Sequence, residues 1–373
     1  GYSSPKYISF MNLMKSNFKN IEIETYERWD YPRSKYNIPN FHFKRNILSG
    51  WLEKIKPDEN KFWIRLLRKF SLVISEILMI LKIIQEAKDQ NILLVTTFEN
   101  PLFGLIKSRN VCILQNYSEI WGEDHLNLSG KIQALLFSSL LDKYRGNVKL
   151  CVSPQHDRLL IAEKTYPNAK QYLVLNCPPI DTSETRNKDF NEIKILYQGV
   201  IGNTNYPLQL INTLAELSNH YEVHFAGKVD DNFKEFFNKS VKESSIIEHG
   251  YLNQFQLSEL RLKCNVGIVY WDDSNLNTKF CAPNKLFEYI SSGYFVISSV
   301  NHSLNDFYNR FQYGVNIDAE KVDVVNVLSN IDIETMNRVS KRNVGLFTES
   351  LNFESQNEKL ISDLSKFINS ESH

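Results

Sequence analysis

A lysine and a glutamate stand three positions apart in the segment APNKLFEYISSGYFVISS, residues 282–299, which predicts a short helix followed by an apolar strand. Pro283 suits the first turn of that helix, because proline has no N–H to lose there and its φ is already helical. Gly293 suits the C′ position at the end of the helix. Lys285 and Glu288 therefore share one helix face, while the apolar residues beside them can pack toward a sheet.

This face suits two parts of a nucleoside diphosphate. A lysine beside the unpaired N–H groups of a helix start attracts phosphate, because the ammonium and the helix dipole add in sign. A carboxylate one turn later can accept hydrogen bonds from the vicinal hydroxyls of a ribose. The same spacing also suits an exposed i,i+3 ion pair, which stabilises a helix by only about 0.2–0.5 kcal/mol. The spacing of Lys285 and Glu288 alone does not separate these two interpretations.

The composition of the whole chain limits the classes of protein to consider. With 373 residues, 42% of them hydrophobic, the chain exceeds what one compact core usually holds, which predicts two domains. Lys plus Arg equals Asp plus Glu at 43 each, so no overall field favours nucleic acid or another highly charged partner.

The cysteines and the amino-terminal segment indicate a cytoplasmic protein. The segment GYSSPKYISF lacks the pattern of a secretory signal, and no run of about 18 apolar residues predicts a membrane span. No pair of cysteines has C-x-x-C spacing, so we expect reduced core thiols. The five cysteines are Cys112, Cys151, Cys177, Cys264 and Cys281.

Short apolar runs alternate with helical runs along both halves of the chain, which predicts parallel sheets covered by helices. In the second half the apolar runs are KILYQG, EVHFAG, SIIEHGYL, NVGIVYW and YFVISS. In the first half they are IEIETYE, NILLVTTFE, NVCILQNY, NVKLCVS and QYLVLN. The polar, proline-bearing stretch at 178–190 is the best candidate for a linker.

The second half resembles the retaining glycosyltransferases of the GT-B fold, in particular the family 4 group that uses nucleotide-sugar donors. The similarity runs from about Ile193 to Asp318, and its most specific element is the P-x-K-x-x-E-Y segment that starts at Pro283. The first half matches only in the order of its elements.

The resemblance implies an α/β protein with two Rossmann-like domains, a cleft between them and a carboxyl-terminal helix that crosses back. We expect the first domain at 1–180, with its first strand apparently absent, the donor domain at 190–350 and the returning helix at 351–373.

Each matching residue also carries an implied role. Glu288 corresponds to the ribose ligand, and Lys285 corresponds to the diphosphate ligand, together with the helix start at Pro283 and Asn284. The other donor-binding positions that the resemblance suggests are Gly199, Gly202 and Asn203 for the phosphates, Tyr251 and Leu252 for the base, the loop 274–281 for the sugar, and Ser3.

Three positions depart from the family pattern. Phe280 stands eight positions before Glu288, where the family often has a glutamate that contacts the sugar. Asn203 and Asn205 stand where the family often has cations. The family commonly places a histidine after the strand that matches VCILQNY, and this chain has Gln115, Asn116 and Tyr117 there.

These departures shape the expected chemistry. The sequence contains no D-x-D motif, and the side chains of adjacent aspartates point apart in an extended stretch, so we expect no metal and no cofactor besides the donor. Lys285 would then stabilise the diphosphate leaving group, with Asn116 and His125 as the other candidate catalytic residues. A lone loop histidine such as His125 is also compatible with simple solvation.

Residues 61–84 combine Lys61, Arg65, Arg68 and Lys69 with a broad apolar face. A basic amphipathic helix of this kind could rest on an anionic membrane, on its inner face, where a lipid-linked acceptor would lie. The same pattern also fits a helix that packs in the first domain with its cations outward.

We therefore expect a metal-independent, retaining, hexosyl-type glycosyltransferase of polysaccharide biosynthesis. It would move a sugar from a UDP- or GDP-sugar to a glycan, lipid-linked or protein acceptor. Phe280 and the missing cations and histidine keep open a catalytically silent GT-B subunit that binds glycan or a partner glycosyltransferase. A nucleotide-sugar epimerase of the same architecture is a third hypothesis, which would need paired acid and base carboxylates.

Overall fold

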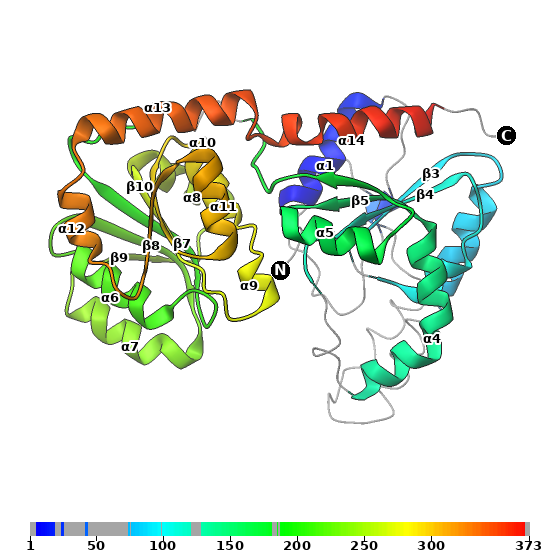
Figure 1. The fold of residues 1–373 in the computed structure, drawn as a ribbon, viewed down its shortest axis with the longest axis horizontal. Coiled ribbons are helices and arrows are strands. Elements are labelled where there is room, and N and C mark those ends of the chain that lie inside the picture. Colours follow the sequence, from blue (N-terminus) through cyan, green and yellow to red (C-terminus); the bar gives the residue numbers. More distant parts are fainter. Residues whose placement is uncertain are drawn as a thin grey trace. The chain divides into compact units, whose positions relative to one another are not determined.

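The computed structural model describes residues 5–18, 24–25, 42–43, 74, 76–97, 99–120, 128–180, 185 and 187–369. These residues divide between two compact units. Unit 1 comprises Gly1–Leu173 and Glu358–His373, and unit 2 comprises Val174–Asn357. Each unit is built on its own parallel sheet (Figure 1).

Unit 1 contains a four-stranded sheet in the order β3-β4-β5-β6, and every neighbouring pair in it is parallel. The strands are β3 (Ile92–Thr96), β4 (Val111–Asn116), β5 (Val148–Ser153) and β6 (Lys170–Leu173). Two strands of two residues, β1 (Glu24–Thr25) and β2 (His42–Phe43), pair separately. Helices in the described part of this unit include α1 (Pro5–Asn17), η1 (Pro101–Leu105), α4 (Leu128–Asn147) and α5 (His156–Thr165).

The six-stranded sheet of unit 2 has the order β12-β11-β10-β7-β8-β9, and all its pairs are parallel. Its strands are β7 (Lys194–Ile201), β8 (Glu222–Val229), β9 (Ile247–Gly250), β10 (Val266–Val269), β11 (Phe295–Ser299) and β12 (Gly314–Ile317). Numbered from β7 as the first strand, this is the order 3-2-1-4-5-6 of a Rossmann sheet. The chain therefore reverses its direction of growth between β7 and β10.

Helices cover both faces of the unit 2 sheet (Figure 1). On one face, α6 (Pro207–Leu217), α7 (Asp231–Lys242) and α12 (Val324–Ser329) share one apolar core with the strands. On the other lie α8 (Gln254–Lys263), α10 (Asn284–Ser291) and α11 (His302–Phe311). Strands covered on both faces must be apolar on both, which explains the continuous apolar runs in the sequence. All residues of β10 and β11 are buried.

The short helix α10 forms much as its sequence predicts. It begins at Asn284, with Pro283 at the N-cap, one position earlier than the first-turn place expected from the sequence. Gly293 has a φ of 70°, and its N–H donates to the carbonyl of Ile290, so the glycine ends the helix in the left-handed conformation. The helix is thus fixed at both ends before the chain enters β11.

The chain ends in two long helices, α13 (Ile333–Glu349) and α14 (Phe353–Ile368). The first turn of α14 is tied to unit 2, where the N–H of Phe353 donates to the carbonyl of Pro178. Its later residues belong to unit 1, where Asp363 accepts hydrogen bonds from Lys170 at 2.5 Å and Tyr172 at 2.7 Å. The predicted α/β class, with parallel sheets and a carboxyl-terminal helix that returns to the first domain, is confirmed.

All five cysteines are buried and free, as the sequence predicts. Of the segment 61–84, residues 61–73 and 75 lie outside the described residues, so its basic part is not placed. Residues 76–86 are helical, and Ile77, Leu78 and Leu81 are exposed on that helix. Among the described helices, none is long and apolar enough to cross a membrane.

Candidate functional site

The end of β7 lies where the unit 2 sheet reverses its direction of growth. In a doubly wound sheet, ligands bind outside the carboxyl ends of the strands at this reversal, because the helices that follow diverge to opposite faces. Here the reversal lies between β7 and its neighbour β10. The loop QGVIG, residues 198–202, forms the carboxyl end of β7 and is therefore placed for ligand contact.

A buried asparagine shapes this loop. The side chain of Asn205 accepts a hydrogen bond from the N–H of Gly202 at 3.0 Å and donates one to the hydroxyl of Tyr197 at 2.9 Å. That hydroxyl in turn donates to the carbonyl of Val200 at 2.9 Å. The N–H of Gly202 is thus already used within the protein, and a Cβ at this position would lie 2.2 Å from the Oδ2 atom of Asp230. Gly202 therefore also makes room for a neighbouring carboxylate.

Lys285 reaches from α10 to the same loop. Its Nζ atom donates to the hydroxyl of Tyr197 at 3.1 Å and lies 4.2 Å from the centroid of that ring. Gly199 has a φ of 121°, and a Cβ there would lie 3.1 Å from the ammonium nitrogen. The glycine therefore leaves one side of the ammonium open toward the loop backbone. Burial lowers the pKa of Lys285 to about 8, although the charge of Glu288 acts in the opposite direction.

Glu288 is held by two residues from other elements. Gln198 on β7 donates a side-chain hydrogen bond to its Oε2 atom. The Nη1 atom of Arg261, on α8, lies 3.7 Å from that same oxygen. The Glu288 side chain is 23% exposed, and Lys285 is also half-buried. The interpretation of an exposed ion pair on a solvated helix face is therefore wrong.

A lysine and a tyrosine lie together at the carboxyl ends of β8 and β9. Tyr251 follows Gly250, which has a φ of 62°, and the tyrosine is 70% exposed. The Nζ atom of Lys228 lies 5.5 Å from the centroid of its ring. An exposed aromatic ring suits stacking with a flat ligand group, and Lys228 supplies a cation that the sequence interpretation did not find. Leu252, next along the chain, is half-buried.

The remaining predicted positions are spread over both units. In unit 2, Asn203 and Asn284 are exposed, and Phe280 packs edge-on against His302 with the ring centroids 5.3 Å apart. Asn116 lies in unit 1, buried at the end of β4. His125 and Ser3 lie outside the described residues. The structure thus brings together Lys285, Gly199 and the carboxylate of Glu288, all within unit 2.

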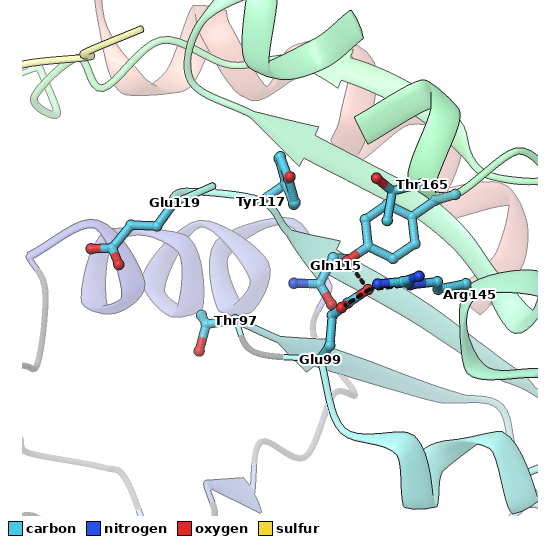
Figure 2. Close-up of a pocket in the computed structure, with 8 residues that line it drawn as sticks. Thr97, Glu99, Gln115, Tyr117, Glu119, Arg145 and Thr165 are labelled. Atoms are coloured by element: carbon cyan, nitrogen blue, oxygen red, sulfur yellow. Dashed lines mark hydrogen bonds and ion pairs between the residues drawn. The ribbon is translucent and has the colours of Figure 1, made fainter. Parts of the chain in front are cut away.

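Unit 1 contains a polar pocket of about 60 Å³ (Figure 2). At one side Arg145 forms two hydrogen bonds with Glu99, both of 2.8 Å, and the hydroxyl of Tyr166 donates to Glu99 at 3.0 Å. Figure 2 shows the carboxylate of Glu119 apart from this pair. The other lining residues are Thr97, Gln115, Tyr117 and Thr165. A pocket of this size and polarity suits hydroxyl groups or water.

The adjacent aspartates of unit 2 make contacts within the protein. Asp272 accepts a hydrogen bond from the N–H of Ser274 at 3.0 Å, and Asp273 accepts one from the side chain of Asn301 at 2.5 Å. Within the described part of the chain, no group of three or more His, Cys, Asp or Glu side chains could hold a metal ion.

Comparison with known proteins finds similarity in structure only. No protein-family model matches the sequence, and no curated protein sequence matches it either. WaaG, a glycosyltransferase of lipopolysaccharide biosynthesis, is similar over 96% of both chains, with a TM-score of 0.58 and 10% identity. HepE from Anabaena in complex with UDP is similar over 81% of this chain and 88% of its own, with a TM-score of 0.56 and 10% identity.

A third similar structure is TarM, which matches 74% of this chain and 55% of its own length, with a TM-score of 0.50 and 12% identity. All three are GT-B glycosyltransferases. At such low identity the similarity shows the fold alone. The chain has the GT-B fold, with two parallel-sheet α/β domains.

Proposed function

We propose that this protein is a glycosyltransferase that takes its donor sugar from a nucleoside diphosphate sugar. The observation that carries the proposal is the placement of Lys285 beside Gly199, with Glu288 one turn further along α10. An ammonium at a glycine loop and a helix start suits a diphosphate, and a held carboxylate suits a ribose. The GT-B fold gives this combination a glycosyl-transfer context, although fold alone does not define function.

The residues of unit 2 supply the electrostatic part of such a reaction. When the sugar leaves, negative charge builds up on the diphosphate. The ammonium of Lys285, which lies beside Gly199, and the N–H groups at the start of α10 stabilise that charge without prior reorganisation. The proposal includes retention of the anomeric configuration, metal independence and a hexosyl group, as the family resemblance implies.

The base of the donor is proposed to be uracil or guanine. Tyr251 offers an exposed ring on which a base could stack, and Lys228 beside it can donate to a base carbonyl. Uracil is the first choice, since the similar structures include HepE bound to UDP.

The acceptor is proposed to be a glycan, a lipid-linked glycan or a protein. The pocket of unit 1 suits an acceptor hydroxyl, because carboxylate and hydroxyl groups line it on several sides. Glu119 is the carboxylate in this pocket that stands apart from the Glu99–Arg145 pair, which makes it the candidate to bind such a hydroxyl.

A binding panel tests the donor site. Isothermal titration with UDP, GDP, CDP and dTDP should show one preferred nucleotide, and Glu288→Ala should weaken its binding about tenfold, as expected for lost hydrogen bonds to a ribose. Glu259→Ala, which removes an exposed carboxylate from α8, is the matched control for the loss of a carboxylate in unit 2. Binding that is equal in wild type and Glu288→Ala would contradict the ribose assignment.

A catalytically silent subunit is the second candidate function, and one observation favours it. Phe280 packs against His302 in the loop expected to face the sugar, so an apolar contact stands where the family often has a carboxylate. This supports a silent subunit that binds the nucleotide or a glycan without turnover. Slow hydrolysis or transfer of the donor by the purified protein supports the enzyme, and binding without turnover across a panel of acceptors supports the silent subunit.

A further inference from the structure

A buried arginine lies behind the proposed ribose ligand. Arg261 is on α8, its side chain is 3% exposed, and its Nη1 atom lies 3.7 Å from Oε2 of Glu288. A buried guanidinium is costly unless a partner compensates the lost solvation, so an arginine at such a position calls for an explanation. An aliphatic side chain would satisfy the packing of α8 against the sheet without that cost.

The contacts of Glu288 are one-sided. Gln198 and Arg261 belong to two different elements, yet the atom of Glu288 that both contact is Oε2. Among the described residues, none donates a hydrogen bond to Oε1 in this structure. Since Gln198 is 5% exposed and Arg261 only 2%, both partners stand on the protein side of the carboxylate. Oε1 is therefore the oxygen that a ligand can use.

The placement of Arg261 also affects Lys285. The lysine and Glu288 are three positions apart on one helix, the spacing at which an ammonium and a carboxylate normally attract each other. Here the carboxylate has a cation behind it, while the lysine donates to the uncharged hydroxyl of Tyr197. The guanidinium thus offsets the charge of Glu288, so that the ammonium stays available to an anion.

We propose that Arg261 is a positioning residue of the donor site: with Gln198 it fixes the carboxylate of Glu288 so that Oε1 meets a ribose hydroxyl. This inference rests on the proposed function and goes beyond it, because it makes discrimination between ribose and deoxyribose depend on a residue that does not touch the ligand. The side chain of Glu288 is already held in one orientation before the ligand arrives. Binding therefore costs little further side-chain entropy.

The experiment compares ribonucleotides with their deoxy forms. Affinities for UDP and GDP, and for the 2′-deoxy and 3′-deoxy forms of each, are measured by titration calorimetry on wild type, Arg261→Met and Gln198→Leu. Wild type should prefer a ribonucleotide to one of its deoxy forms about tenfold, the worth of one hydrogen bond to a charged group. Arg261→Met and Gln198→Leu should lose most of that preference.

The matched control is Arg158→Met, which removes another buried arginine, this one in unit 1. It should keep the preference for ribose. Circular dichroism and thermal unfolding establish which variants are folded, and if Arg261→Met does not fold, Gln198→Leu and Arg261→Lys carry the test. Arg261→Lys keeps the charge but not the guanidinium, so it should keep part of the preference.

The possible failures are distinct. Wild-type protein that binds no nucleoside diphosphate refutes the proposed function itself. Wild type that binds with a ribose preference, and folded variants that keep that preference in full, overturn the role of Arg261 alone. Equal weakening of ribo- and deoxynucleotides in the variants also overturns it, because a purely structural residue would act on both alike.

Discussion

Nucleotide affinity should fall as the pH rises through about 8, because Lys285 attracts a diphosphate only while it is protonated. Burial lowers the pKa of this ammonium to about 8 in the ligand-free protein. About 90% of the molecules then carry the charge at pH 7 and about 10% at pH 9. If the protonated form alone binds, the dissociation constant should rise about tenfold between these two pH values.

The assay is titration calorimetry with the preferred nucleoside diphosphate at half-unit steps from pH 7 to pH 9.5. Starting at pH 7 keeps the phosphates largely ionised throughout, so their own titration contributes little. Lys285→Arg is the matched control, because a guanidinium stays protonated over the whole range. Titration of the nucleobase affects both proteins equally and cancels in the comparison.

The difference between the pH profiles of wild type and Lys285→Arg decides whether Lys285 causes the loss of affinity. An affinity that is constant up to about pH 7.5 and then falls in wild type, but not in Lys285→Arg, supports the ammonium as the diphosphate ligand. Parallel curves for the two proteins refute the reasoning, since the loss would then belong to another group. Lys285→Met should weaken binding at every pH, with no inflection near 8.

Three further outcomes follow from contacts in unit 2. Lys285→Met should raise the unfolding free energy of the ligand-free protein by about 1–3 kcal/mol in denaturant titrations at pH 7, since it removes a charge that burial penalises. Acid should destabilise the protein below about pH 6.5: burial and the neighbouring His224 lower the pKa of His249, so the unfolded chain binds more protons there. His249→Asn should flatten this slope in denaturant titrations between pH 5 and 7. Gly227→Ala should cost at least about 2 kcal/mol, because the new Cβ would lie 1.8 Å from the carbonyl oxygen of Gly199; an unchanged melting midpoint would contradict that contact.

The fold could be predicted because its signals are local. Strands buried on both faces need continuous apolar residues, and the runs NVGIVYW and YFVISS became β10 and β11. A glycine after an amphipathic run predicts a helix end, and Gly293 has the positive φ that such an end uses. The order of the strands within the sheet is not local, and the family resemblance predicted only that the domains are Rossmann-like.

The candidate site could be predicted only where its residues share one element. Lys285 and Glu288 lie on one helix, so their spacing alone placed them on one face. Gln198 and Arg261 come 90 and 27 positions earlier in the chain, and no spacing rule connects them to Glu288. Within the run QFQLSELRLK, Arg261 reads as an ordinary solvent-facing cation of an amphipathic helix. Only the packing of α8 against the sheet shows that it is buried.

Arg261 and Lys285 are the two cations near Glu288, and their different contacts suit them to different roles. A planar guanidinium suits lasting burial beside a carboxylate, since it is always charged and more weakly hydrated than an ammonium. An ammonium whose pKa is about 8 gains more from an incoming anion, because the ligand then compensates a desolvation that Tyr197 and Glu288 compensate only in part. Arg261→Lys should therefore hold Glu288 less well, because a buried ammonium loses its proton more readily than a guanidinium, and Lys285→Met should stabilise the fold while weakening the binding of a diphosphate. The free-energy cost of burying the Lys285 ammonium in the ligand-free protein is thus part of what makes this lysine a good ligand for a diphosphate.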